Sequence, residues 1–571
     1  MKKPVAIFIL VIAFAIFLRV YKLNDSPPGL YSDEAAYGYN AYSLLKTGHD
    51  EYGKSWPLAL KSFGDYKPPM TAWLTIPSIA AFGLTEFAVR LPSALAGVAS
   101  VIGIYYLTLE LFLRSSKLPI FKKKYSAFLP IIAAILLTIS PWHLLFTRSS
   151  MLVGIEVMFI TWGLVFFLKA IKKQFYLPIS SICFAGAIYT YYGSRITVPL
   201  LIFGLLLIFR KELSKIKKTL GLSAILGLIL MMPLVLSTSN DPEILTGRAN
   251  TVSIFYDSGI KSKLWEAHTL DGPDFPPLVG RFFHNKPYFY FKDSLRRYLQ
   301  HFSVDFLFVT GDPHPPFDIP NMGNIYIVDA PFILLGLFFV IKYVQKKTSS
   351  LLLLLLVTPI ASSFTFVTPA ANRSFLMVIG ITILSALGII YSIKTLAYNL
   401  KINWKLVTLF ILVLYAVSFS HFLYNYFIAT PLKIPEKWHY GRKELIEKVS
   451  LKESAFEKVV VTDKGGPPYI WFLFYKRYDP EIYRLTASVN NIPDKFGFIH
   501  IDSFDKYTFA RNFNWSTIQK NTDTLYVGFE EEIPDGLHRE IDGSTYRVII
   551  DAKIKYPNRG TVFKLVHLEK I

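Results

Sequence analysis

The chain has 571 residues and a formal net charge of +20. Its composition is 52% hydrophobic and 18% charged, whereas soluble proteins carry about 25% charged residues. These values exclude an ordinary soluble protein and indicate membrane spans, because a helix needs about 20 apolar residues to cross a bilayer. The excess Lys and Arg lies in short loops between apolar runs, so we expect no nucleic-acid partner. The single cysteine, Cys183, excludes an intramolecular disulfide and gives no sign of zinc chemistry.

The apolar runs predict a polytopic α-helical membrane protein with about eleven transmembrane helices. They lie near residues 4–20, 90–113, 126–142, 151–168, 175–192, 196–209, 219–236, 329–344, 350–368, 374–393 and 406–427. A cleaved signal peptide is the alternative for the first run. However, no small-residue cleavage site follows it, and Arg19 and Lys22 flank its end. We therefore expect the first run to be retained as a span.

The connections between these runs alternate in charge, which predicts their orientation. Five basic residues fall in 114–124 and five in 210–218, and further Lys groups follow residues 168, 341 and 393. Because positively charged loops stay inside, we expect these connections and the N-terminus to be cytoplasmic, in a multi-pass protein of the plasma membrane. The segment 21–89, the long loop 237–328 and the C-terminal region are then extracytoplasmic.

A change of composition divides the chain into a transmembrane domain, 1–428, and an extracytoplasmic α/β domain, 429–571. In the second part, apolar runs shorten to strand length, as in KVVVTD, FGFIHID, TLYVGF and YRVIID. The loop GGPP lacks the spacing and the Lys-Ser/Thr of a phosphate loop, so we expect no nucleotide site there. The Tyr-rich segment 21–89 is predicted to form short interfacial helices with their apolar faces in lipid.

Asp33 and Glu34 are candidate catalytic residues. They follow the first span by about a dozen residues, which places them near the outer membrane surface. Adjacent carboxylates at that level suit a general base or a metal site. A solvated helix start is the alternative, since Ser32-Asp33-Glu34 also has the pattern of a helix N-terminus. The residues alone leave both interpretations open.

Asp65, Lys67 and Arg90 are candidate site residues of the same extracytoplasmic segment. The two prolines after Lys67 stiffen the chain and hold this lysine outside a helix, where it can pair with Asp33 or with a phosphate. An ordinary interfacial lysine is the alternative. Arg90 opens the second predicted span, where structural packing is the alternative to a binding role.

Arg148, Arg195 and Arg373 each stand in a short outer loop of a protein that otherwise keeps positive charge inside. Three cations on one face favour a shared anionic ligand, whereas contact with lipid headgroups explains any one of them alone. His143 is expected to be a hydrogen-bond partner rather than a metal ligand. The proline-rich loop GDPHPPFDIP carries two Asp and one His, which is a weak metal signal, and we predict no metal site.

Together these elements resemble the GT-C glycosyltransferases, in the branch that contains protein O-mannosyltransferases and lipid A aminoarabinose transferases. The matching elements are Asp33-Glu34, Lys67-Pro68-Pro69, the stretch 83–92, SPWHLLFTR, YYGSRITVPLL and PPYIWFLFYKRYDPEIY. The last also resembles phospholipid-carrier-dependent glycosyltransferases. The aminoarabinose transferases have Glu-Lys-Pro-Pro, whereas here Tyr66 precedes Lys67 and the acid is Asp65. The resemblance is dense over residues 1–200 and looser beyond.

The resemblance implies a GT-C fold and a cell-envelope enzyme whose active site opens on the outer face. The donor would be a sugar on a polyprenyl phosphate, and the acceptor a hydroxyl of a glycan, lipid or protein. Transfer would invert the anomeric carbon without an obligatory metal cofactor. Asp33 would be the general base, Glu34 would position a substrate, and Lys67 would set the charge of Asp33. The substrate-binding residues would be Asp65, Arg90, His143, Arg148, Arg195 and Arg373, the last three through the donor phosphate.

Three alternatives stay open at this point. A lipid-glycan transporter or flippase would also carry basic outer residues, but it predicts repeated halves and ionisable residues in mid-span. A sensor with an outer ligand-binding domain would need a cytoplasmic output domain, and the sequence contains none. An oligosaccharide transferase that moves a glycan en bloc would use a metal with further acidic motifs. The sequence does not specify the sugar or the acceptor.

Overall fold

The computed structural model describes residues 2–113, 128–256, 259–272, 274–314, 316–343, 345–399, 401–494, 497–511, 513, 515, 521–533, 535, 538–541, 544–558 and 560–571. The basic connection 114–124, predicted to be cytoplasmic, lies outside the described residues. The chain forms two compact units. Unit 1 contains Met1–Tyr21 and Ser93–Asn425, and unit 2 contains Lys22–Pro92 and Tyr426–Ile571. The predicted division at residue 428 stays a prediction. The two units differ from it chiefly by grouping residues 22–92 with the C-terminal region.

A helix lies at each of the predicted apolar runs of unit 1. These helices are α1 (Lys2–Val20), α4 (Glu86–Thr108, continued by a π-helical turn, Leu109–Leu113), α6 (Leu129–Ile139), α7 (Pro141–Arg148), α8 (Val153–Ala170), α9 (Tyr176–Thr190), α10 (Ser194–Ile208), α12 (Lys217–Asn240), α17 (Asp329–Lys342), α18 (Lys346–Ser363), α19 (Met377–Asn399) and α20 (Trp404–Tyr424). Among the described residues, five helices are long and apolar enough to cross a membrane, or six if the bent pair α6 and α7 is one span. The protein is therefore helical with several apolar helices, and the count of eleven spans stays a prediction.

The helices of unit 1 differ in how much of their apolar surface they bury. In α8 and α19, 72% and 78% of the most apolar stretch of 18 residues is buried inside the protein. In α12 and α20 only 11% and 22% is buried, so these helices present apolar side chains outward, as a lipid-facing surface requires. Pro141 separates α6 from α7, and the two helices meet at an angle of 58°.

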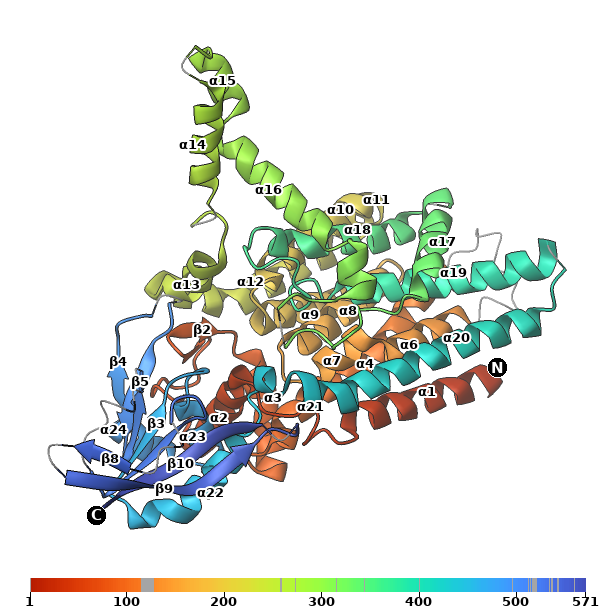
Figure 1. The fold of residues 1–571 in the computed structure, drawn as a ribbon. Coiled ribbons are helices and arrows are strands. Elements are labelled where there is room, and N and C mark those ends of the chain that lie inside the picture. The colour runs from red at the N-terminus through yellow and green to blue at the C-terminus, as the bar shows by residue number, and fades with distance from the viewer. Residues whose placement is uncertain are drawn as a thin grey trace. The chain divides into compact units, whose positions relative to one another are not determined.

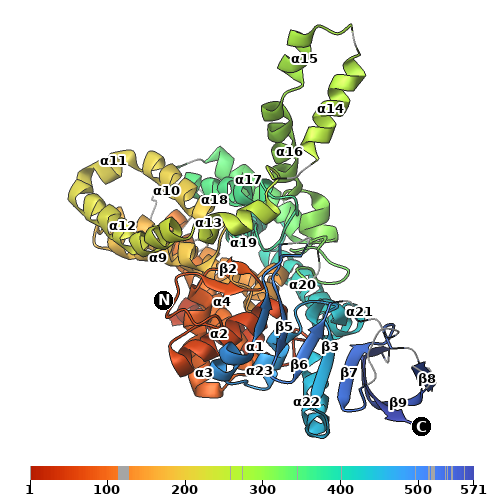
Figure 2. The same ribbon diagram turned by 90° about the vertical axis from the view of Figure 1, so that its left-hand side faces the viewer.

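The long loop of unit 1 is largely helical. Its helices are α13 (Glu243–Val252), α14 (Ile260–Asp271), α15 (Pro277–Phe283), α16 (Lys286–Gln300) and a π-helical turn, Asp305–Val309. Figure 2 shows α14 and α16 side by side, with α15 joining them at the tip. α16 in turn packs against α18, which anchors this helical hairpin on the rest of unit 1.

Unit 2 begins with α2 (Ser32–Thr47), the strands β1 (Leu60–Ser62) and β2 (Asp65–Lys67), and α3 (Met70–Phe82). The predicted short helices are therefore present. However, α2 buries ten of its residues and packs against α3 and two helices of the C-terminal region, α23 (Tyr469–Tyr475) and α24 (Pro480–Thr486). Its apolar face meets protein rather than lipid, which the amphipathic pattern alone does not distinguish.

The C-terminal part of unit 2 contains an eight-stranded mixed sheet (Figure 1). The strand order is β4 (Ser488–Asn490), β5 (His500–Phe504), β6 (Tyr507–Ala510), β3 (Lys458–Thr462), β7 (Thr524–Phe529), β10 (Thr561–Lys570), β9 (Ser544–Lys555) and β8 (His538–Ile541). β3 pairs in parallel with β6 and β7, and the other pairs are antiparallel. Three predicted strands coincide with β3, β7 and β9, and β5 overlaps the end of FGFIHID. The C-terminal region is therefore rich in sheet, and the predicted extracytoplasmic α/β domain stays a prediction.

Candidate active site

The first turn of α2 carries the adjacent carboxylates Asp33 and Glu34. The residue before the helix, Tyr31, has extended backbone, and its N–H donates to Glu34 Oε2 at 3.1 Å. Helix N-termini favour negative charge, because the backbone N–H groups of the first turn have no partner within the helix. The sequence therefore places two anions where the helix itself stabilises them. The two side chains differ in exposure and in partners.

Glu34 is fully buried and forms a two-fold contact with Arg90. Arg90 donates from Nε to Oε1 at 3.0 Å and from Nη2 to Oε2 at 3.1 Å, and both side chains are 0% exposed. The remaining guanidinium hydrogens go to the backbone carbonyls of Leu23, Pro27 and Gly29. This pair ties the segment before α2 to the first turn of α4. Such a contact fits the packing role that the sequence left open for Arg90.

Asp33 keeps 41% of its side chain exposed and accepts a hydrogen bond from Lys67 Nζ at 2.6 Å. Lys67 ends β2, which pairs with β1 in a tight hairpin whose turn is Phe63-Gly64. Both turn residues have positive φ, as a two-residue turn of this kind requires. The Lys67 ammonium also lies 5.2 Å from the centroid of the Phe63 ring, so the hairpin fixes the cation beside the exposed carboxylate.

Asp65 stands at the other end of β2, opposite Ser62 in the hairpin ladder, and is partly buried. The residue of β2 that pairs with Asp33 is Lys67, two positions after Asp65 along the strand. The sequence predicts substrate binding by Asp65, and this stays a prediction.

A buried carboxylate, Glu51, stands next to the hairpin and has no counterpart in the sequence predictions. Its Oε1 accepts from Ser62 Oγ at 2.6 Å, and its backbone N–H donates to Asn40 Oδ1 at 3.0 Å. Burial raises the pKa of Glu51 to about 8, against the smaller opposing effects of Ser62 and Lys67. Glu51 is therefore largely protonated at neutral pH, while the charge of Lys67 is balanced by Asp33.

His439 is a second neighbour of Asp33 that the sequence does not reveal. It lies in the turn before the helix α22 (Arg442–Lys452), and its ring is 5.3 Å from the ring of Tyr31. Burial and the guanidinium of Arg442 lower the pKa of His439, whereas Asp33 raises it. At neutral pH this imidazole is uncharged. It therefore adds a neutral hydrogen-bonding group near Asp33.

In unit 1, the element SPWHLLFTR forms α7 and is buried along its whole length. The Nδ1 atom of His143 is 2.6 Å from Nη2 of Arg19, and both side chains are 0% exposed. Trp142 donates from Nε1 to the carbonyl of Ala371 at 3.1 Å. These contacts give α7 a packing role. Substrate binding by His143 stays a prediction.

The three arginines of the predicted outer loops differ in exposure. Arg148 is 1% exposed, and its guanidinium donates to the carbonyls of Leu18 and, at 2.8 Å, Tyr21 at the end of α1. Arg195 and Arg373 are only partly buried. Arg195 donates to the carbonyl of Ile244 at 3.0 Å, so all three arginines already have partners within the protein.

Arg373 belongs to a cluster of hydrogen bonds around the loop after α18, which sequence analysis missed. Its Nη1 donates to Thr365 Oγ1 and to the carbonyl of Val367. Arg297 of α16 donates to the carbonyls of Thr365 and Phe366, so two guanidinium groups share the loop after α18. The sequence gives no local signal for this arrangement, because Arg297 lies in a different segment, 68 residues before Thr365.

Asp312 of the GDPHPPFDIP loop also contacts this region. Its Oδ2 accepts from the backbone N–H of Ala371 at 2.6 Å, and its Oδ1 accepts from that of His314 at 2.8 Å. Within the described residues, this loop contributes no three-residue metal cluster. Asp312 therefore supports the backbone beside Arg373.

Comparison with known proteins identifies the fold. Residues 66–236 match the family of dolichyl-phosphate-mannose-protein mannosyltransferases. The chain also matches the structure of ArnT from Cupriavidus metallidurans bound to undecaprenyl phosphate, with a TM-score of 0.55, 11% identity and coverage of 98% of this chain and 97% of that one. The archaeal oligosaccharyltransferase AglB from Archaeoglobus fulgidus, in complex with an inhibitory peptide and a dolichol-phosphate, matches with a TM-score of 0.48, 13% identity and coverage of 83% and 63%. No curated protein sequence matches the chain.

The predicted resemblance to the GT-C glycosyltransferases is therefore confirmed. The chain shares the fold of ArnT over nearly its whole length. The family match covers β2, α3, α4 and the helices up to α12, and so includes Lys67, Arg90, His143, Arg148 and Arg195. Asp33 and Glu34 precede it, and their assignment depends on the geometry of α2.

Proposed function

We propose that the protein is a plasma-membrane glycosyltransferase that moves a single sugar from a polyprenyl-phosphate donor to an acceptor hydroxyl on the outer face. The carrying observation is that Asp33 is the exposed carboxylate of the pair and is held by Lys67 at 2.6 Å. The ArnT structure that shares the fold binds undecaprenyl phosphate, which supports the choice of donor class. The acceptor is a glycan, a lipid or a protein.

Asp33 is the general base of this proposal. The acceptor hydroxyl gives its proton to the Asp33 carboxylate, and its oxygen attacks the anomeric carbon of the donor. The bond between that carbon and the phosphate oxygen breaks, and the polyprenyl phosphate leaves with the electron pair. One displacement inverts the anomeric configuration. Lys67 favours the ionised form of Asp33, which is the form that accepts a proton.

The leaving phosphate requires positive charge, because stabilisation of developing charge is often the largest catalytic contribution. Arg195 and Arg373 are the candidates because both residues are only partly buried, whereas Arg148 is 1% exposed. Arginine suits this role through paired N–H donors that match phosphate oxygens. Glu34 acts through position, because its contact with Arg90 fixes the turn that presents Asp33.

The test is transfer of a labelled sugar from polyprenyl phosphate in liposomes that contain the purified chain. Asp33→Asn removes the base and is expected to lower the rate by about 10²- to 10⁴-fold. The matched control is Asp25→Asn, an exposed carboxylate in the same unit, which is expected to transfer at the wild-type rate. Transfer by Asp33→Asn at the wild-type rate would remove Asp33 from the role of base. A wild-type chain that moves the lipid across the bilayer without transfer would favour the flippase.

Metal dependence separates this proposal from en bloc oligosaccharide transfer. We propose that the displacement needs no catalytic metal, because Lys67 supplies the charge beside Asp33. The rate is therefore expected to persist after chelation by EDTA. Loss of transfer in EDTA, with recovery on addition of Mg²⁺ or Mn²⁺, would favour the oligosaccharide transferase instead.

A further inference from the structure

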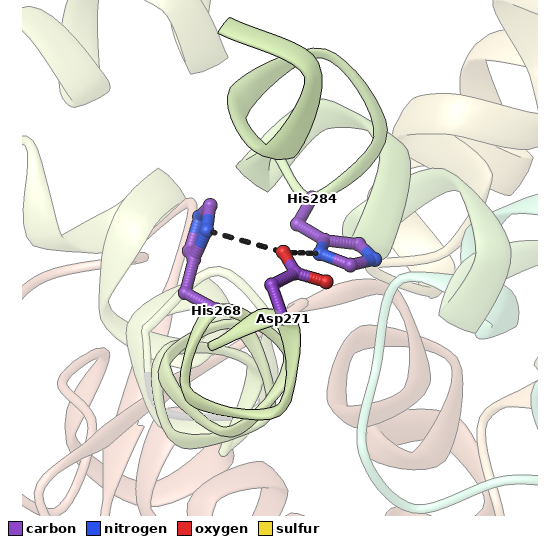
Figure 3. A group of neighbouring side chains, drawn as sticks. All are labelled: His268, Asp271 and His284. Carbon is purple, nitrogen blue, oxygen red and sulfur yellow. Dashed lines mark hydrogen bonds and ion pairs between the residues drawn. The ribbon is translucent and has the colours of Figure 1, made fainter. Parts of the chain in front are cut away.

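Two histidines and an aspartate meet in the helical hairpin of the long loop (Figure 3). His268 and Asp271 stand three residues apart in the last turn of α14, on the same helix face. His284 follows the last residue of α15. The Nδ1 atoms of both imidazoles point toward Oδ2 of Asp271, at 4.0 Å from His268 and 2.7 Å from His284. Each residue thus directs one potential ligand atom to a common point.

The spacing of these atoms is close to that of a tetrahedral metal site. Zinc takes bonds of about 2.0–2.1 Å from imidazole nitrogen and carboxylate oxygen, so neighbouring ligand atoms lie about 3.3 Å apart. The observed distances of 2.7 and 4.0 Å bracket this value, and all three atoms lie within 4.8 Å of one another. Shifts of the two imidazole rings on the order of 1 Å would bring the three atoms to this spacing.

A glycine of α15 stands beside the cluster. Gly272 ends α14, and Pro276 and Pro277 begin α15, which brings Gly280 directly over the cluster. A Cβ atom on Gly280 would lie 3.4 Å from Asp271 Oδ2 and 3.6 Å from His268 Nδ1. The same Cβ would lie 3.5 Å from Cδ1 of Phe275, so Gly280 packs close to the cluster without adding a side chain to it.

The next turn holds His284 in place. Asn285 accepts from the N–H of Tyr288 at 2.8 Å and thereby caps α16, while its Nδ2 donates to the carbonyl of Phe282. The His284 N–H donates to the carbonyl of Gly280 at 2.7 Å. The imidazole therefore projects from a hydrogen-bonded junction between two helices.

We propose that His268, Asp271 and His284 bind one divalent transition-metal ion, best matched by Zn²⁺, with water completing the shell. Two imidazoles and one carboxylate suit zinc, whereas Mg²⁺ and Ca²⁺ prefer sites made of oxygen ligands. The ion replaces the proton shared by His284 and Asp271 and cross-links α14 to the start of α16. It stiffens the hairpin at its tip. The site uses none of the residues proposed for sugar transfer, so each proposal stands or fails alone.

The other His–Asp contacts of the described chain show what distinguishes this cluster. His314 lies 3.3 Å from Asp312, and His567 lies 2.6 Å from Asp551. His567 also contacts Glu569, and His500 contacts Asp463 and Asp494, but each of these histidines meets its two carboxylates through opposite ring nitrogens. Among the described residues, one ligand atom from each of three residues converges only in the hairpin. His314 therefore serves as a matched control that removes a histidine beside an aspartate without removing a third ligand.

The experiment measures bound zinc on the full chain, purified in detergent with an affinity tag free of histidine. The chain is loaded with Zn²⁺, dialysed, and analysed for metal by mass spectrometry. We expect about one equivalent in the wild type and in His314→Ala, and loss of that equivalent in the double variant His268→Ala/His284→Ala. Retention of the equivalent in the double variant, or none in the wild type, would overturn the proposal.

Limited trypsin digestion gives a second readout that metal content alone does not. Lys261, Lys263 and Arg281 are trypsin sites that flank the cluster within the hairpin. Zn²⁺ is expected to slow cleavage at these residues in the wild type and in His314→Ala, with no effect on the double variant. Equal rates with and without Zn²⁺ in the wild type would contradict a cross-link. A thermal unfolding curve for the double variant checks that it is folded.

Discussion

The start of α2 and the short helix α7 both carry ionisable groups near a predicted membrane edge, but they bury these groups differently. At α2, Glu34 is 0% exposed while its neighbour Asp33 is 41% exposed. At α7, His143 and Arg148 are both almost fully buried, against a third buried group, Arg19 of α1. One element therefore leaves a carboxylate exposed, and the other encloses every ionisable group it carries.

This difference shows which observation separates a site from a support. Placing a charge in a low-dielectric interior is costly unless it is paired and hydrogen-bonded. Buried charges therefore need hydrogen-bond or ion-pair partners within the protein. Arg90 and Arg148 each donate to backbone carbonyls and thereby connect chain segments. Asp33 has accessible surface and a lysine that balances its charge. Exposure, and not charge at the membrane edge, singles out Asp33.

The largest expected effect comes from breaking the enclosed pair at α2. Arg90→Met leaves Glu34 buried without its cation, which is expected to lower the free energy of unfolding by about 3–5 kcal/mol. Thermal unfolding in detergent measures the change. The double variant Glu34→Leu/Arg90→Met removes both charges and is expected to be more stable than Arg90→Met. A single variant as stable as the wild type would contradict a structural role for the pair.

The matching test at α7 is Arg148→Met. The carbonyls of Leu18 and Tyr21 lose their donor, and each unsatisfied acceptor costs about 1–3 kcal/mol when water cannot replace it. Tyr21 is 46% exposed and its carbonyl can regain water, so we expect a loss of about 2 kcal/mol in all. Arg373→Met, which replaces a partly exposed arginine, is the variant whose loss of stability is compared with that of Arg148→Met. A normal thermal midpoint for Arg148→Met, together with a raised KM for the lipid donor, would assign Arg148 to phosphate binding instead.

Sequence reasoning succeeds in this protein where the signal is local. The apolar runs coincide with helices because hydrophobicity over one segment decides burial for that segment. The Asp33–Lys67 contact is also anticipated, since two prolines hold Lys67 in extended chain and the structure contains the ion pair at 2.6 Å. The split between Asp33 and Glu34 is not anticipated. It depends on Arg90, which lies 56 residues further along the chain.

The residues that sequence reasoning missed owe their environment to distant segments. The indole of Trp471 donates to the carbonyl of Leu30, 441 residues earlier, and His439 reaches the same region from the C-terminal part. Glu51 follows Asp50 in an ordinary polar stretch and becomes buried only when β1 and Asn40 enclose it. No spacing within the sequence encodes such contacts.

Glu51 sharpens the comparison because it is buried like Glu34 but is hydrogen-bonded to neutral groups. Its pKa of about 8 in the folded chain exceeds the usual 4.5, so the folded state holds a proton that the unfolded state releases. This contribution to stability is complete below pH 4.5 and is lost as pH rises through 8, with a slope of at most about 1.4 kcal/mol per pH unit. Glu51→Gln is therefore expected to flatten the fall in thermal midpoint between about pH 5 and about pH 8. Asp25→Asn, the control, keeps the wild-type slope, and an unchanged slope in Glu51→Gln would contradict the raised pKa.

Lys67→Met is expected to change stability least and function selectively. The partner of Lys67 is 41% exposed, and ion pairs with solvent access contribute about 0–1 kcal/mol, so the thermal midpoint is expected to stay near that of the wild type. If the proposed mechanism holds, transfer falls by about 100-fold, because Asp33 loses the cation that positions it and the leaving phosphate loses a nearby positive charge. Lys67→Arg preserves the charge and should recover part of the rate. A large loss of stability in Lys67→Met, with transfer reduced only in proportion to the folded fraction, would contradict this. The Asp33–Lys67 pair would then have a structural role, like the buried groups of α7. The measured ratio of the two effects therefore decides whether exposure at Asp33 marks a site.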